Sequence, residues 1–174
     1  MQRKELEHLI RAAAAITNQY EFVIIGSQSI LGAQPYAPAA LLQSMEADFY
    51  PLNDPELADL IDGSIGELSP FHDRFGYYAQ GVGPTTAILP KDWQSRLVKI
   101  QNENTDLKIG LCLDPTDLAA SKLAAGRDKD WLFVSELLRH KFVDHAVLIE
   151  RIQTLNIDEK RQQALIQWVQ ATRS

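Results

Sequence analysis

An apolar run that ends at a glycine and a serine constrains the fold of this chain more than any other stretch. Phe22–Ile25 is uninterrupted and mostly β-branched, which is typical of a buried strand, and Gly26-Ser27 follows it directly. The pattern beyond the glycine predicts a short helix over 27–33. A strand that ends in Gly-Ser and opens a helix presents backbone N–H groups and a hydroxyl to a phosphate. We therefore expect a phosphate-binding turn at this point.

A second short stretch, over 46–50, carries two acidic side chains. Its alternation places Glu46, Asp48 and Tyr50 on one face of a strand. Two carboxylates on one face, beside a phosphate-binding turn, suit a hard divalent cation that bridges to a nucleotide. We therefore expect Glu46 and Asp48 to bind Mg²⁺ and to be catalytic. As an isolated pattern, such a pair is also typical of a solvated strand surface.

The third informative segment is a helix of leucine and alanine that carries one lysine. A capping pattern at Asp114 predicts where this helix starts. Lys122 must either extend its ammonium group to solvent or find an anion, for which a phosphate is a natural partner. Asp117 falls at the third helical position, where an acid can cap the helix. The charged residues 127–130 that follow are typical of either a solvated helix junction or a binding site.

The first two stretches together resemble a known signature. Gly26-Ser27 followed by Glu46-x-Asp48 is similar to the Gly-Ser…Asp-x-Asp signature of the nucleotidyltransferase superfamily, with glutamate in the first acidic place. The glutamate keeps the charge but lengthens the side chain by one methylene. No third carboxylate stands out on the later predicted strands.

The third segment extends this resemblance. Asp117 and Lys122, followed by Arg127-x-Lys129-Asp130, resemble the third and fourth motifs of the AbiEii-like nucleotidyltransferases, a group that includes toxins of toxin–antitoxin and abortive-infection systems. The wider frame resembles a bacterial family of uncharacterised nucleotidyltransferase-like proteins, at residues 75–82, 89–93 and 96–98. The similarity spans roughly residues 20–140.

The resemblance implies a role for each candidate residue. The residues expected to bind the nucleotide are Gly26, Ser27, Ser29, Lys122, Arg127 and Lys129. Glu46 and Asp48 would bind the metal, and Asp130 would be either a polar anchor in the cleft or a base for the incoming hydroxyl. The implied reaction is Mg²⁺-dependent transfer of a nucleoside monophosphate from an NTP to a hydroxyl of RNA or protein, with a toxin–antitoxin role and an antitoxin partner as further expectations.

Two other classes of function stay open. One is a catalytically degenerate binding or assembly module with the shape of a nucleotidyltransferase, because fold alone does not fix activity. The other is a structural protein that dimerises through its last two predicted helices. A serine hydrolase is disfavoured, because Ile30 occupies the place of the second glycine of a nucleophile elbow.

Periodicity along the chain predicts an α/β (α+β) fold, with a mixed sheet flanked by helices over 1–126 and a helical subdomain over 127–174. Helices are predicted over 3–18, 54–61, 118–125, 131–140, 143–155 and 159–172. Strands are predicted over 20–25, 46–50, 77–82, 86–89, 96–101 and 107–113. Residues 63–75 are expected to form a loop with a turn at 70–74.

Composition excludes several partners and compartments. The net charge of −6 argues against the broad basic surface that sequence-specific binding of duplex DNA requires. The single cysteine, Cys112, cannot form an internal disulfide and is predicted to lie in the core. No apolar run approaches the ~18 residues of a membrane span, and the start of the sequence lacks a signal-peptide pattern. The expectation is a cytoplasmic protein without membrane partners.

Overall fold

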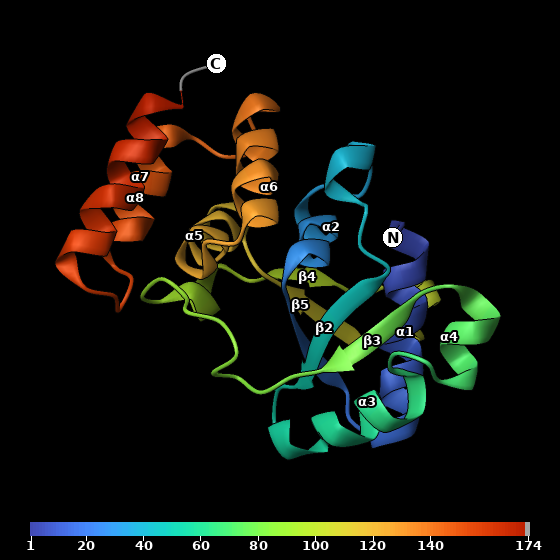
Figure 1. The fold of residues 1–174 in the computed structure, drawn as a ribbon. Helices are drawn as coiled ribbons and strands as arrows, with labels where there is room; N and C mark the ends of the chain where they lie inside the picture. The colour runs from blue at the N-terminus through green and yellow to red at the C-terminus, as the bar shows by residue number, and fades with distance from the viewer. Residues whose placement is uncertain (173–174) are drawn as a thin grey trace.

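A mixed five-stranded sheet with helices on both sides forms the centre of the computed structural model, which describes residues 1–172 (Figure 1). The strands lie in the order β3-β2-β1-β5-β4. Their bounds are β1 Glu21–Ile25, β2 Glu46–Pro51, β3 Tyr78–Gly81, β4 Val98–Ile100 and β5 Ile109–Cys112. The predicted α/β fold with a mixed sheet is therefore confirmed.

The strand register brings the two predicted motifs together. β1 runs antiparallel to β2 and parallel to β5, and Ile25 at the end of β1 lies opposite Asp48 of β2. β2 and β3 are parallel, and Glu46 lies opposite Tyr78. The acidic half of β2 is thus flanked by the Gly-Ser turn on one side and by a tyrosine on the other.

One face of the sheet is covered by the first three helices, α1 (Arg3–Thr17), α2 (Ile30–Ala33) and α3 (Ala58–Ile65). Ile10 of α1 lies against Gly110, and Gly32 of α2 lies against Cys112, two residues further along β5. Residues two apart on a strand share a face, so α1 and α2 cover the same face. α1 also packs against α3. Short α4 (Pro70–Phe75) lies outside α3 (Figure 1).

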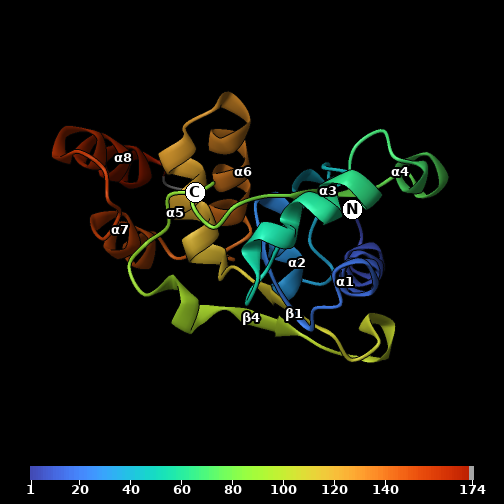
Figure 2. The same cartoon turned by 90° about the horizontal axis from the view of Figure 1, so that it is seen from below.

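The last four helices form a second group beyond the sheet, α5 (Pro115–Ala125), α6 (Asp128–Arg139), α7 (His145–Gln153) and α8 (Glu159–Ala171). The view from below separates this group from α1, α3 and α4 (Figure 2). α5 packs on α6 and α7, and it also contacts α2 and the 3₁₀ turn Ser27–Ser29. Trp131 of α6 and Trp168 of α8 meet edge to face at 4.8 Å between ring centroids. The domain boundary after residue 126 stays a prediction.

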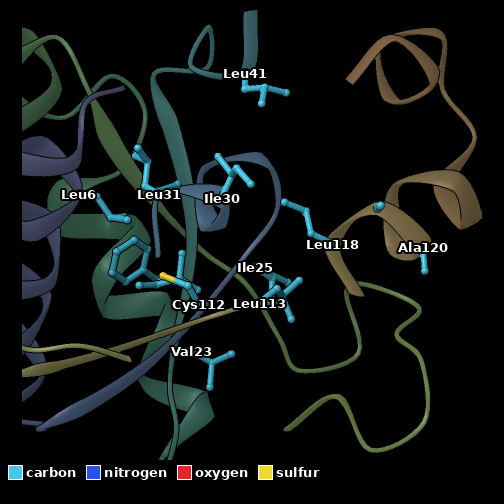
Figure 3. Close-up of a cluster of buried hydrophobic side chains, with 14 of the residues drawn as sticks. Leu6, Val23, Ile25, Ile30, Leu31, Leu41, Cys112, Leu113, Leu118 and Ala120 are labelled. Carbon is cyan, nitrogen blue, oxygen red and sulfur yellow. The ribbon is translucent and has the colours of Figure 1, made fainter. Parts of the chain in front are cut away.

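A continuous apolar core connects the sheet to both groups of helices. Figure 3 shows Leu6 of α1 on one side of the cluster and Leu118 of α5, pointing towards Ile30, on the other. Each of these side chains is almost completely buried, which contributes about 1.5–3 kcal/mol per side chain to stability. Cys112 is fully buried in this cluster, as predicted, and burial raises the pKa of its thiol to about 12.

Two aspartates, the partly exposed Asp114 and the buried Asp117, hold the first turn of α5 in place. The Asp114 carboxylate caps the helix by accepting from the backbone N–H groups of Thr116 and Asp117, as the sequence predicts. Asp117 does occupy the third helical position, but its carboxylate accepts two hydrogen bonds from Arg96, at 2.8 and 2.9 Å. Arg151 of α7 lies 3.3 Å from the same carboxylate. Asp117 therefore joins three segments of the chain.

Two predictions of local structure are wrong. Residues 63–75, expected to be a loop, contain the end of α3 and all of α4. Ser69 caps α4 by accepting from the His72 backbone N–H, and Pro70 occupies the first helical position, so the pattern read as a turn is a helix start. Residues 86–89, expected to be a strand, belong to the irregular segment between β3 and β4.

No helix within residues 1–172 combines the length and the apolar character needed to cross a membrane.

Candidate active site

The turn after β1 brings a glycine against the second carboxylate of the predicted pair. Gly26 has φ 72° and ψ −173°, a backbone conformation that other residues rarely adopt. A Cβ atom at this position would overlap the Asp48 carboxylate. Glycine is therefore required here by the backbone conformation and also by the space that Asp48 occupies.

The acidic pair lies on the face of β2 opposite to Ala47 and Phe49. Ala47 and Phe49 are buried, whereas Glu46 and Asp48 on the other face are only partly covered. The Tyr78 hydroxyl donates a hydrogen bond of 2.8 Å to Glu46 Oε2. This bond orients the Glu46 carboxylate from the neighbouring strand.

The Asp48 carboxyl group binds a proton more tightly than an ordinary aspartate does. Burial raises its pKa to about 7, with the charge of Glu46 and a hydrogen bond to Glu46 acting in the same direction. The positive charges of Lys122 and Arg127 oppose this shift but do not cancel it. Two adjacent carboxylates cannot both ionise readily without a neighbouring cation. Asp48 therefore favours either a bound proton or a further cation nearby.

The anion that Lys122 contacts is a carboxylate of the protein itself. Its Nζ lies 3.3 Å from Oδ1 of the fully buried Asp130. Arg127 donates to Asp130 through Nε, at 2.7 Å, and through its backbone N–H, at 3.2 Å. Burial by itself would raise the pKa of Asp130, but the bonds from Arg127 and the charge of Lys122 hold it below its usual value. An acid with these contacts is better suited to anchor two cations than to accept a proton.

Two hollows meet at these charged residues. The polar hollow, of about 510 Å³, is bounded by Glu46, Asp48, Lys122 and Arg127, and further by Ser27, Gln28, Lys129, Asp130, Phe133 and Glu136. The apolar hollow, of about 440 Å³, shares the first four residues and is bounded further by Gly26, Gln80, Val82, Ile88, Leu118 and Ser121. The acidic pair and the two cations thus form the junction between them.

The structure places all but one of the predicted site residues around the two hollows. Ser27 and Lys129 line the polar hollow, and Gly26 lines the apolar one. The exception is Ser29, which is fully buried and whose hydroxyl donates to the Gly26 carbonyl at 2.8 Å. Ser29 lines neither hollow and instead braces the turn.

Sequence reasoning missed three residues of the site. Gln28 is 1% exposed and lines the polar hollow; its Nε2 donates to the Leu41 carbonyl, while its Oε1 has no hydrogen-bond partner. Phe133 lies 5.4 Å from Lys122 Nζ, measured to the ring centroid. Tyr78 binds Glu46. Only Gln28 had a local signal, since it lies between the two serines of the turn.

The donor set is suited to a magnesium ion. Mg²⁺ is usually bound by one or two carboxylates together with phosphate oxygens of the substrate. Glu46 and Asp48 offer two adjacent carboxylates, and the raised pKa of Asp48 reflects the negative charge of its neighbour as well as burial. Within residues 1–172, no group of three or more His, Cys, Asp or Glu side chains could hold a metal. A metal here would therefore depend on two protein carboxylates and on the substrate.

Comparison with known proteins gives one match. A family model described as a nucleotidyltransferase of unknown function (DUF6036) matches residues 4–174. No curated protein and no solved structure matches the chain.

Proposed function

The chain belongs to this family of nucleotidyltransferases of unknown function, and from that premise we propose that it transfers a nucleoside monophosphate from an NTP to a hydroxyl group. One observation carries the proposal. The acidic pair of β2 meets two cations from α5 and α6 beside the Gly26 turn, where the two hollows join. Two carboxylates, two cations and a phosphate-binding turn are the parts that phosphoryl-transfer chemistry uses.

The charge of the polar hollow supports a role for a divalent cation. Three basic residues line it, Lys122, Arg127 and Lys129, against four acidic ones, Glu46, Asp48, Asp130 and Glu136. Protein charges alone therefore do not favour a triphosphate at this place. Mg²⁺ held by Glu46 and Asp48 would neutralise phosphate charge and polarise the α-phosphorus.

The protein side chains divide the remaining tasks. Ser27, Lys122, Arg127 and Lys129 bind the triphosphate in the polar hollow, and Asp130 positions Lys122 and Arg127. The acceptor oxygen forms a bond to the α-phosphorus while the bond from that phosphorus to the pyrophosphate oxygen breaks. The hydroxyl proton leaves through the carboxylate pair to water, and the products are a nucleotidyl ester and pyrophosphate.

Three finer parts of the hypothesis have only the resemblance of the motifs as support. These are the AbiEii-like subgroup, the role in a toxin–antitoxin pair and the antitoxin partner. Residues 117–130 carry that resemblance, and in this chain Asp117 binds Arg96 and lines neither hollow. We therefore assign nucleotide binding to the second half of the motif, from Lys122 onwards.

A second candidate function is a nucleotide-binding module without catalysis. The observation that favours it is the presence of only two carboxylates at the junction, since residues 1–172 offer no larger group of metal-binding side chains. Such a module would bind Mg²⁺–NTP and would release no pyrophosphate.

Calorimetric titration of each of the four NTPs, with and without Mg²⁺, tests the proposal. We expect wild-type protein to bind at least one NTP only when Mg²⁺ is present, and Asp48→Asn to lose that binding. Asp62→Asn is the matched control, because Asp62 is an exposed acid of α3 outside both hollows. Pyrophosphate release then separates the enzyme from the inert module. Absence of binding by the wild type to every NTP would refute both.

A further inference from the structure

We propose that the apolar hollow receives the acceptor, and that the acceptor hydroxyl belongs to a protein side chain. This inference rests on the proposed function, because it assigns the second substrate of the same site. It follows from the difference between the linings of the two hollows, which share four residues and otherwise differ in chemistry.

The direction of attack assigns the acceptor to the apolar hollow. In phosphoryl transfer, the attacking and leaving oxygens lie roughly in line across the phosphorus. The leaving pyrophosphate belongs in the polar hollow, where Ser27 and Lys129 add phosphate-binding groups to the shared cations. The hydroxyl must then approach the acidic pair from elsewhere. The apolar hollow is a second space that reaches Glu46 and Asp48.

The lining of the apolar hollow suits an uncharged group. Beyond the four shared residues its walls are mostly aliphatic, formed by Ile25, Val82, Ala87, Ile88, Leu118 and Ala124. Gln80, Thr86 and Ser121 add neutral hydrogen-bonding groups of the kind that can bind a peptide backbone. Gln80 is exposed on the edge strand β3, and Ile88 is 41% exposed, so this side of the hollow opens to solvent.

The charges of the hollow disfavour an RNA acceptor. RNA carries a phosphate on every nucleotide, and its binding depends on basic side chains that neutralise those phosphates. Of the described residues that line the hollow, only Lys122 and Arg127 are basic, and Glu46 and Asp48 balance them. Lys122 and Arg127 are also already engaged with Asp130. No surplus of positive charge is therefore left for the phosphates next to an RNA end.

Transfer of the nucleotide to a protein hydroxyl needs no reactant besides the NTP and the acceptor. The oxygen of the protein hydroxyl bonds to the α-phosphorus of the NTP, and the bond to the pyrophosphate oxygen breaks. The hydroxyl proton passes to water, and the protein acceptor carries a nucleoside monophosphate in phosphodiester linkage. Electrons stay balanced, because no atom changes its oxidation state.

Methyl NMR of the full chain tests this assignment. The protein is saturated with Mg²⁺ and the α,β-methylene analogue of whichever NTP binds best, and the methyl signals of Val82, Ile88 and Ala124 are followed. Two probes are titrated separately: N-acetyl-tyrosinamide, which carries a neutral protein hydroxyl, and an RNA hexanucleotide with a free 3′ hydroxyl. We expect the amide to shift these signals to saturation and the RNA to leave them unchanged.

A pair of variants tests whether the amide binds in the apolar hollow. Ile88→Asp adds a charge to the hollow and should weaken amide binding about tenfold or more. Leu68→Asp, at a position that is 83% exposed and outside both hollows, is the matched control and should bind the amide like the wild type.

Each result decides the question. Saturating shifts with the amide that Ile88→Asp weakens support the inference. Shifts with the RNA, alone or together with the amide, overturn it, and so do shifts with neither probe or amide shifts that Ile88→Asp leaves unchanged. In each of these cases the proposed function stands on the Mg²⁺–NTP titration. A protein that binds no NTP in that titration overturns the proposed function, and the inference with it.

Discussion

The carboxylate of Asp48 lies so close to Gly26 that a side chain at position 26 would overlap it. The last residue of β1 is paired with Asp48, so the Gly26-Ser27 turn and the acidic pair are held together by the strand register. Substitution at Gly26 should therefore act on the acidic pair as well as on the turn.

Gly26→Ala should weaken Mg²⁺-dependent NTP binding by at least about tenfold, because it displaces Asp48 and strains the backbone by about 1–3 kcal/mol. Gly76→Ala is the control, since Gly76 also has positive φ, at 76°, but a Cβ there would meet nothing. Calorimetry and thermal unfolding of both variants separate the two effects. Equal NTP affinity in both variants would show that Asp48 is not needed for binding.

Asp48 should destabilise the folded protein at neutral pH. Its pKa is raised to about 7 from an ordinary 3.8, so the folded state binds this proton more tightly than the unfolded state. Its contribution to stability is fully present below pH 3.8 and is lost as pH rises through about 7. Asp48→Asn mimics the protonated form and should unfold at the same or a higher temperature than wild type at pH 8, with the difference shrinking towards pH 5.

The measurement for that prediction is the melting temperature of both proteins between pH 5 and pH 8. About 2–4 °C is expected for each kcal/mol of repulsion removed. An Asp48→Asn variant that melts well below the wild type at pH 8 would show that the ionised Asp48 carboxylate stabilises the fold. That result would contradict the raised pKa of Asp48.

Asp130→Asn should be strongly destabilising. It leaves Lys122 buried, and Arg127 beside it, without the carboxylate that both contact, and breaking a buried pair in this way costs about 3–5 kcal/mol. Asp128→Asn, on an exposed acid two residues earlier in α6, should change stability by less than about 0.5 kcal/mol. Chemical denaturation of both variants checks this, and similar losses in the two would refute the anchoring role.

Arg96→Lys should not behave as a conservative change. Arg96 donates two hydrogen bonds to the buried Asp117, and the single ammonium group of lysine cannot reproduce that fork. The expected loss is about 1–3 kcal/mol of unfolding free energy. Lys99→Arg, on an exposed residue of β4, is the control and should be neutral. A neutral Arg96→Lys would mean that the three-segment contact at Asp117 adds little to stability.

Much of the fold and of the candidate site follows from local patterns in the sequence. The strand before Gly26, the alternation around Asp48 and the cap at Asp114 are properties of short segments, and the structure confirms the elements that they predict. The pairs that organise the site are not local. Arg96 and Asp117 are 21 residues apart, and Tyr78 and Glu46 are 32 apart, so only the three-dimensional fold reveals them.

The prediction of a loop over 63–75 is wrong because packing can outweigh local helix propensity. Gly63 lies at the start of that predicted loop, but α3 continues through it to Ile65, since a glycine inside a helix costs only about 1 kcal/mol and packing on the sheet can outweigh that. The role of Ser29 in binding the nucleotide stays a prediction. In the structure its hydroxyl donates to the Gly26 carbonyl, because a hydroxyl in a tight turn can bond nearby backbone.

Paramagnetic broadening by Mn²⁺ tests the central claim most directly. Small amounts of Mn²⁺ with NTP are added to ¹⁵N-labelled protein, and the amide signals that disappear first mark the metal site. Binding by Glu46 and Asp48 predicts loss of the Gly26, Ala47 and Asp48 signals, and no loss of these signals in Asp48→Asn. Broadening centred on the exposed acids of α3, with the Gly26 signal unchanged, would contradict the proposed site.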